Sequence, residues 1–316
     1  MALRPQRLRP LELVAFQDRY KHIGVEPRMP NFAAWIHGVD LARPLSEAVR
    51  QELRQALWDF EVLFFHPQEI TSEQHLALAE VFGPLGSGAF WDQGDGKAEL
   101  EILAFDEEHP PFVDAWHTDL VFKKQPPAGS VIQITEIPPG GGNTCWVSTT
   151  KAYDALSPGL QAYFGTLSTE NTWEITGYRE YLAEKGWDVL VQALRDYPPQ
   201  SHPLVLTHPV SGKKSLYFNK ETARRIENVD IRESKGMLEF VAAWVQRPEF
   251  MIHHRWEAHG IAIWDNRTTQ HYACADYWPY RRVNQRTTFS GPLTAQAPAV
   301  ASRRDAAPAP ALAQWK

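Results

Sequence analysis

His117 and Asp119 stand two positions apart in the segment WHTDLVF, residues 116–122. In a strand, residues i and i+2 point to the same face, so this imidazole and this carboxylate can converge on one point. Two arrangements fit such a pair: a metal ion held by nitrogen and oxygen, or a buried hydrogen-bonded pair. The pattern H-x-D is short and occurs often by chance, so a metal site needs further ligands elsewhere in the chain.

A third candidate ligand, His271, lies in the C-terminal segment 261–291, together with Arg282 and Arg286. Two histidines and one carboxylate can occupy one face of an octahedral iron(II), which leaves three positions open for substrates and oxygen. A guanidinium stays charged at any relevant pH and forms two parallel hydrogen bonds to a carboxylate, so an arginine here could anchor an acid at the metal. The alternative is that these arginines, with Arg281, form a solvated charged face.

The elements that must position these residues alternate irregularly along the chain. Apolar residues at helical spacing predict three helices, at 45–60 (with Ser46 as N-cap), 71–83 (ending at a Gly) and 231–246. Short apolar runs predict strands at 61–65, 130–137 and 286–291, and two short strands around a turn at 253–266. Strands without regular βαβ alternation indicate a β-rich core with surrounding helices, a double-stranded β-helix or jelly roll, cupin-like. In a jelly roll the ends of distant strands are neighbours, so Asp119 and His271 can meet.

Composition excludes several classes of protein. The chain has 316 residues and 43% hydrophobic content, which is ample for the core of one large domain. The net charge of −6 provides no basic field, so no nucleic-acid partner is expected. The two cysteines, Cys145 and Cys274, argue against a disulfide scaffold and favour a cytoplasmic location. No membrane partner is expected either, because no apolar run approaches the length of a membrane span, and the N-terminal segment lacks the apolar core of a signal peptide.

Three motifs taken together, WHTD, GGNTCW and WDNRTTQHYACADYWPYRR, resemble the taurine dioxygenase family of iron(II)/2-oxoglutarate enzymes. That family also includes aryloxyalkanoate dioxygenases and alkylsulfatases. The segments GVDLARPLS, VLFFHPQEIT, FGPLG, PPAGSVI and THPVSGKKSLYFN fit the family in order. The resemblance implies an N-terminal extension at 1–20, a dioxygenase domain at 21–291 and an Ala/Pro-rich tail at 292–316, which we expect to be disordered.

The resemblance also implies roles for individual residues. His117, Asp119 and His271 match the iron ligands, which are the catalytic residues of the family. Thr144, in GGNTCW, matches the threonine whose hydroxyl binds a carboxylate of 2-oxoglutarate. Arg282 matches the arginine that pairs with the distal carboxylate of that cosubstrate. The implied cofactor is Fe(II), with 2-oxoglutarate and O2 as cosubstrates.

The substrate pocket is expected to contain Arg286, which matches an arginine that holds the anionic end of the substrate in the taurine enzyme. Trp173 and Tyr217 fall near family positions that line this pocket, although ordinary core packing explains them equally well. Phe90 and Trp91 lie on an expected loop, where large aromatic residues are harder to explain structurally. We expect these two to form a lid over the iron.

The sequence departs from the taurine enzyme at the positions that read the amine of taurine. Gly86 stands where that enzyme has a His, and Val113 where it has an Asn. Cys274 also replaces an Asn, and we interpret it as a small packed residue. These changes remove polar groups, so the expected substrate is a bulkier or more apolar anion than taurine.

The expected reaction is hydroxylation of a C–H bond of a small organic anion, with succinate and CO2 as co-products. A C–S, sulfate-ester or aryl-ether bond would be cleaved where the hydroxylated carbon bears that group. Three alternatives remain open: a biosynthetic oxygenase of an amino-acid-derived acid, a zinc hydrolase with the same ligands, and a non-catalytic cupin-like binding protein. The resemblance also implies a homo-oligomer, a dimer or tetramer.

Overall fold

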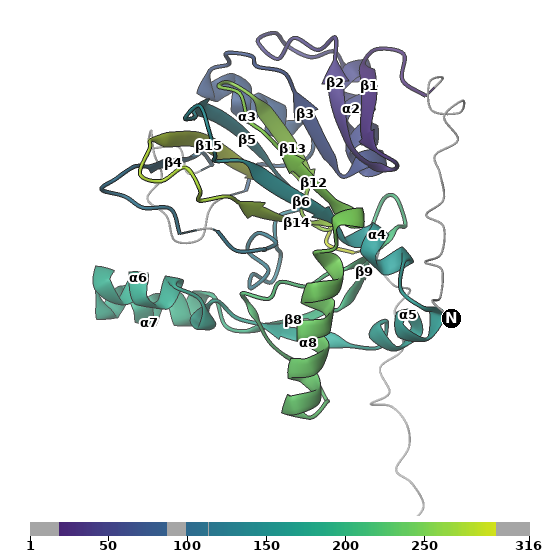
Figure 1. Cartoon of the computed structure of the whole chain (residues 1–316), viewed down its shortest axis with the longest axis vertical. Helices are drawn as coiled ribbons and strands as arrows, with labels where there is room; N and C mark the ends of the chain where they lie inside the picture. The colour runs from purple at the N-terminus through teal and green to yellow at the C-terminus, as the bar shows by residue number, and fades with distance from the viewer. Residues whose placement is uncertain (1–18, 87–98, 113, 295–316) are drawn as a thin grey trace, which may run out of the picture.

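Two facing β-sheets form the centre of the molecule in a computed structural model that describes residues 19–86, 99–112 and 114–294 (Figure 1). The major sheet contains, in spatial order, β1 (Gly24–Met29), β2 (Phe32–His37), β3 (Val62–Phe65), β13 (Ile261–Asp265), β5 (Gly129–Glu136), β15 (Arg282–Phe289) and β4 (Glu101–Phe105). The minor sheet contains β12 (Met251–His254), β6 (Thr144–Ser148) and β14 (Thr269–Ala273). Strand pairs in both sheets are antiparallel except β2 with β3.

Large aromatic side chains fill the space between the two sheets. Trp146 of the minor sheet packs against Phe64 and Trp264 of the major sheet, with ring centroids 5.4 and 5.9 Å apart. All three side chains are fully buried. Aromatic pairs at such distances add to the stabilisation that apolar burial provides. This layer of two packed antiparallel sheets is the jelly-roll core that the sequence predicts.

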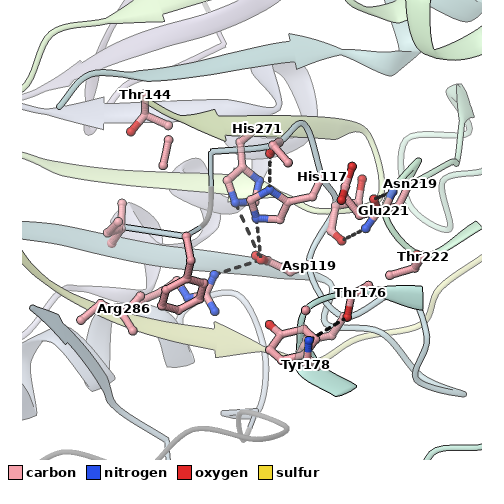
Figure 2. Close-up of a pocket in the computed structure, with 18 of the residues that line it drawn as sticks. His117, Asp119, Thr144, Thr176, Tyr178, Asn219, Glu221, Thr222, His271 and Arg286 are labelled. Carbon is pink, nitrogen blue, oxygen red and sulfur yellow. Dashed lines mark hydrogen bonds and ion pairs between the residues drawn. The ribbon is translucent and has the colours of Figure 1, made fainter. Parts of the chain in front are cut away.

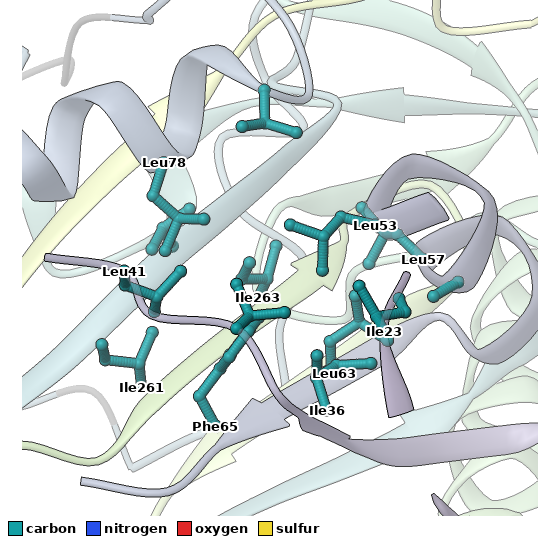
Figure 3. Packing of buried hydrophobic residues seen from close by; sticks show 14 of the residues in the cluster. Ile23, Ile36, Leu41, Leu53, Leu57, Leu63, Phe65, Leu78, Ile261 and Ile263 are labelled. Atoms are coloured by element: carbon teal, nitrogen blue, oxygen red, sulfur yellow. The ribbon is translucent and has the colours of Figure 1, made fainter. Parts of the chain in front are cut away.

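Two helices cover the outer face of the major sheet, α2 (Glu47–Phe60) and α3 (Ser72–Glu80). Ser46 is the N-cap of α2, as predicted, and its side chain accepts a hydrogen bond from the backbone N–H of Val49. Leu53 and Leu57 of α2 pack on Leu63 and Ile263 of the sheet (Figure 3). The helical spacing of apolar residues in the sequence therefore reflects the face of α2 that packs on the sheet.

His75 is a buried residue of α3, and its titration makes the stability of the protein depend on pH. Burial lowers the pKa of its side chain from 6.5 to about 4. As the pH falls below about 6.5 the unfolded chain binds a proton first, so stability is lost progressively down to about pH 4. His75→Leu should therefore raise the free energy of unfolding by about 2 kcal/mol more at pH 5 than at pH 7, measured by urea denaturation. The exposed His109→Leu serves as the control, and an equal gain for His75→Leu at both pH values would refute the prediction.

The remaining elements lie on the opposite side of the minor sheet from α2 and α3 (Figure 1). Two small sheets are present there, one of β7 (Ser168–Asn171), β8 (Gln200–Pro203) and β11 (Ala223–Ile226), and one of β9 (Val205–Thr207) and β10 (Lys214–Leu216). The helices are α4 (Thr149–Asp154), α5 (Pro158–Phe164), α6 (Tyr178–Lys185), α7 (Trp187–Asp196) and α8 (Ile231–Val245), with 3-10 turns η1 (Trp173–Ile175) and η2 (Pro248–Phe250). Their apolar residues form a separate core around α4, α5 and α8.

Several predicted elements differ from the structure in their bounds or partners. The helix expected to end at Gly83 ends at Glu80, and the strand expected from Arg286 begins at Arg282. The two short strands around a turn at 253–266 exist as β12 and β13, but they pair in different sheets. Chain direction and sheet membership depend on distant partners, which local periodicity does not reveal.

Most of the expected N-terminal extension and C-terminal tail, and both Phe90 and Trp91, lie outside the described residues. Among the helices that the structure describes, none is both long and apolar enough to cross a membrane.

Candidate active site

His117, Asp119 and His271 meet beside β14, the edge strand of the minor sheet, as the sequence predicts (Figure 2). A short antiparallel bridge joins the two histidines, because each backbone N–H donates to the other's carbonyl, at 3.0 and 2.9 Å. The Nε2 atoms of His117 and His271 lie 3.8 and 3.7 Å from Oδ1 of Asp119. One ligand atom from each residue lies within 4.8 Å of the others. Two nitrogens and one oxygen at this spacing can hold one metal ion.

The surroundings of the two imidazole rings suit a metal bound at Nε2 of each. Nδ1 of His117 lies 2.7 Å from the carbonyl oxygen of Ala115, which favours the tautomer with a proton on Nδ1 and a lone pair on Nε2. Nδ1 of His271 has no hydrogen-bond partner among the described residues. Burial, followed by the charge of His117, lowers the pKa of His271 well below its usual value, so its ring is neutral and able to bind a metal.

Asp119 is held in place through both its backbone and its carboxylate. Asn266 brackets the backbone, because its Oδ1 accepts from the N–H of Asp119 and its Nδ2 donates to the carbonyl, both at 2.9 Å. Ser130 donates to Oδ2 at 2.9 Å, and Nη1 of Arg286 donates to Oδ1 at 2.9 Å. Burial would raise the pKa of Asp119, but the positive charge of Arg286, the largest of the opposing causes, holds it well below its usual range. The carboxylate is therefore ionised at neutral pH, as a metal ligand must be.

Asn266→Ala should weaken metal binding although Asn266 is not itself a ligand. The variant loses the two hydrogen bonds that fix the backbone of Asp119. Loss of such a supporting partner typically costs about 10- to 100-fold in metal affinity. Titration of the metal-free protein with Mn(II) measures the effect. Asn171→Ala removes an equally buried Asn, so it should cost stability and leave metal affinity unchanged. Equal affinities in the two variants would show that Asn266 plays no positioning role.

The three residues open on a cavity of about 390 Å³ between the sheets and α6. Thr144 lines one end of it, and its Oγ1 accepts a hydrogen bond of 2.9 Å from Nε1 of Trp256. Because the indole N–H uses a lone pair of the hydroxyl, the O–H of Thr144 remains available to donate into the cavity. This is the donor that the sequence assigns to a 2-oxoglutarate carboxylate.

Arg282 lines the same cavity and contacts Gly142, two residues before Thr144. The residue is 4% exposed, its Nε donates to the carbonyl of Gly142 at 3.3 Å, and its Cζ lies 5.7 Å from the ring centre of Tyr277. No carboxylate of the described residues forms an ion pair with it. A buried cation without a carboxylate is costly unless a ligand supplies the negative charge. The arrangement therefore favours a bound acid.

Arg286 also lines the cavity, but two protein carboxylates hold it. Its Nε and Nη2 donate to Oε2 of Glu101 at 3.0 and 2.7 Å, in addition to the bond from Nη1 to Asp119. Three of the five N–H groups of the guanidinium are thus used, and two remain for a substrate. The role of Glu101 as a partner of Arg286 was not predicted from the sequence. A Glu in the otherwise apolar strand EILAF is nevertheless a sign of a buried ionic partner.

Trp173 and Tyr217, expected in the substrate pocket, are not among the residues that line the cavity. Trp173 is fully buried and donates from Nε1 to the carbonyl of Tyr197 at 2.9 Å. Tyr217 packs in a separate buried cluster with Leu206. Both therefore serve the packing that the sequence analysis kept as the alternative.

The structure leaves little room for a side chain at Gly86, where the taurine enzyme has a polar residue. A Cβ atom there would lie 2.4 Å from Oγ1 of Thr288. The backbone of Gly86 also donates to the carbonyl of Thr288 at 2.8 Å, so the close approach is built into the sheet edge. A larger side chain at this position would require the two segments to separate.

Aromatic residues that the sequence did not single out form much of the remaining wall. Phe105 and Phe112 line one side, and Tyr178 and Tyr181 of α6 line another. Their rings form a mostly apolar surface in the cavity that His117, Asp119 and His271 also line, as small-molecule sites usually have. No motif marks them, because their part in the cavity follows from tertiary packing, in which α6 lies against α7, η1 and the segment 120–122.

The chain is similar in sequence and structure to known enzymes over most of its length. The family described as "Taurine catabolism dioxygenase TauD, TfdA family" matches residues 24–288. An alkylsulfatase of Acinetobacter baylyi is 30% identical over 265 residues, which covers 83% of each protein. An alpha-ketoglutarate-dependent 2,4-dichlorophenoxyacetate dioxygenase of Cupriavidus pinatubonensis is 28% identical, covering 78% of this chain and 90% of that protein. A crystal structure of a taurine dioxygenase from Burkholderia xenovorans has a TM-score of 0.73 and 32% identity, covering 86% of this chain and 92% of that chain.

Fold and site together define an oxidoreductase, a dioxygenase that depends on alpha-ketoglutarate (2-oxoglutarate). The chain belongs to the TauD/TfdA family of dioxygenases, as the match over residues 24–288 establishes. The resemblance noted in the sequence motifs is thereby confirmed.

Proposed function

We propose that this enzyme binds iron(II) through His117, Asp119 and His271 and hydroxylates a small organic anion bulkier and more apolar than taurine. The observation that carries the proposal is the buried guanidinium of Arg282, which has no carboxylate partner among the described residues and lines the same cavity as the hydroxyl donor of Thr144. The planar guanidinium of Arg282 and the hydroxyl of Thr144 can together donate hydrogen bonds to a carboxylate. The same cavity contains two imidazoles and a carboxylate that suit iron(II).

The bound iron would supply the activation of oxygen that couples decarboxylation of 2-oxoglutarate to oxidation of the substrate. The residues of the chain position the reactants. Arg282 and Thr144 bind the distal carboxylate of 2-oxoglutarate and thereby fix its orientation in the cavity. Asn266 and Ser130 keep Asp119 in position, and the aromatic wall excludes water from the substrate side.

The cavity suits an anion with an apolar body, and the named relatives favour a sulfate ester or an aryloxy acid. The two remaining N–H groups of Arg286 can hold the anionic group, and Phe105, Phe112, Tyr178 and Tyr181 can surround the apolar part. The named relatives include an alkylsulfatase and a 2,4-dichlorophenoxyacetate dioxygenase. In both substrate classes, hydroxylation of the carbon that bears the oxygen gives an unstable product, which collapses to a carbonyl compound and releases sulfate or a phenol.

Succinate formation tests the proposal and identifies the substrate class. Iron-loaded protein receives 2-oxoglutarate and oxygen with a panel of alkyl sulfates, aryloxy acids, sulfonates and amino-acid derivatives. We expect alkyl sulfates or aryloxy acids to stimulate succinate formation, with sulfate or phenol released in equal amount. Stimulation by amino-acid derivatives alone would support a biosynthetic oxygenase instead. No succinate from protein with verified iron content would refute the proposed activity.

A further inference from the structure

Cys145, His253 and Cys274 form a second cluster of metal-ligating side chains, outside the cavity. One ligand atom of each lies within 4.8 Å of the others. On the minor sheet, Cys145 pairs with His253 of β12 on one side and with Tyr272 of β14 on the other. Cys274 follows Tyr272 by two residues, and its N–H donates to the carbonyl of Asn143 at 2.9 Å, which continues the same ladder. Three adjacent strand positions therefore present two thiols and an imidazole on one face.

This face points away from the iron-binding cavity. Side chains alternate between the two faces along a strand. Thr144 and Trp146 on β6, and His271 and Ala273 on β14, line the cavity. Cys145, between the first two, must point to the opposite side of the sheet. The cluster is thus a separate site, although it shares two strands with the candidate active site.

The geometry favours a bound ion over a disulfide. Cys145 and Cys274 are diagonal neighbours across the β6–β14 ladder, and such positions typically lie about 7–8 Å apart between Cα atoms. A disulfide usually spans only about 4.4–6.8 Å between Cα atoms. A zinc ion with bonds of about 2.3 Å to each sulfur bridges a wider gap, and His253 lies where it can add a third ligand.

We infer that Cys145, Cys274 and His253 bind zinc on the outer face of the minor sheet. Two sulfurs and one nitrogen are ligands that zinc prefers, and three protein ligands leave a fourth position for water or another ligand. Cys145 is buried, Cys274 is half-buried and His253 is exposed, so the ion would be reached from solvent through His253.

Charges of both signs lie near the cluster. Burial raises the pKa of Cys145 to about 12, and the nearby Cys274 adds to the effect. The carboxylate of Asp276 contributes negative charge near both thiols, whereas Arg282 contributes positive charge near Cys274. A neutral thiol of this kind is a poor nucleophile, so the pair does not suit a catalytic role. Zinc would displace the thiol protons, and its affinity should therefore rise with pH.

Cobalt(II) is the probe that tests this inference independently of the dioxygenase activity. Titration of reduced, metal-free protein should produce a near-ultraviolet sulfur-to-cobalt charge-transfer band, which nitrogen and oxygen ligands at the iron site do not give. The band should persist in Asp119→Ala, which lacks an iron ligand. It should be lost in Cys145→Ser and Cys274→Ser, and it should form at higher cobalt concentration in His253→Ala. Excess zinc should abolish it.

Cys274→Ser and His253→Ala affect exposed or half-buried positions, so they keep the test valid if Cys145→Ser does not fold. A band that is absent from the wild type, or unchanged in Cys274→Ser, would overturn the inference. Thiol titration of protein isolated without reductant is the second measurement, and we expect both thiols to react after zinc is removed. Two unreactive sulfurs that reappear on reduction would show a disulfide and would also overturn it.

Discussion

Arg282→Leu should make the ligand-free protein more stable and strongly reduce its stabilisation by 2-oxoglutarate. Arg282 is a buried cation with no ion-pair partner among the described residues, and replacing such a charge by an apolar side chain removes its desolvation cost. The same change removes the fork that would bind the distal carboxylate. Truncating one partner of a buried charge pair costs about 2–5 kcal/mol, or about 30-fold to several-thousandfold in affinity for the cosubstrate.

Thermal unfolding with and without 2-oxoglutarate measures both effects, with Mn(II) present as a redox-stable metal. At about a hundredfold excess over Kd, the wild type gains about 2.7 kcal/mol, which raises Tm by several degrees. At the same concentration, the variant should begin at a higher Tm and gain at most about 0.9 kcal/mol, a third of the wild-type gain. Arg281→Leu is the matched control, because its side chain is 52% exposed and pairs with Asp106 and Glu136. A full response to 2-oxoglutarate in Arg282→Leu would place the carboxylate elsewhere.

The sequence was most informative where a local pattern and a chemical requirement coincide. Helix α2 follows from its apolar spacing and its Ser46 cap, and His117 with Asp119 follows from the alternation of side chains along extended chain. The meeting of these ligands with His271 could be inferred only from the expected jelly roll. In that fold, the segment that contains His117 lies beside β14, so His117 and His271 form an antiparallel bridge.

The substrate side could not be read from the sequence for a physical reason. Its wall consists of side chains from β4, from α6 and from the loops around them, and their convergence depends on how α6 packs against α7, η1 and the segment 120–122. Trp173 and Tyr217 were expected there because they fall near family positions that line the pocket, but large aromatic residues suit a core equally well. Glu101 lies far from Arg286 in sequence, and only the antiparallel pairing of β4 with β15 places them opposite one another.

Asp119→Ala should abolish iron binding and turnover together while the fold survives. The loss of one of three ligands should weaken metal binding by more than about 100-fold, the upper end of what a supporting partner alone contributes. Substitution of a buried charge usually leaves its partner unpaired and destabilises the protein. Here Arg286 keeps two hydrogen bonds to Glu101, at 3.0 and 2.7 Å, so no uncompensated cation remains. The effect on the metal should therefore appear without unfolding.

The pairing of Arg286 with Glu101 makes this variant a clean test of the ligand role. Iron content after reconstitution and succinate formation should both fall to background, with circular dichroism and Tm close to the wild type. Asp40→Ala, which removes an exposed carboxylate paired with Arg43, should change none of these quantities. In Glu101→Ala combined with Asp119→Ala, Arg286 would lose both carboxylates, and stability should then drop by about 3–5 kcal/mol. Retained iron in Asp119→Ala would mean that the two histidines recruit a different third ligand, and the proposed iron site would have to be redrawn around it.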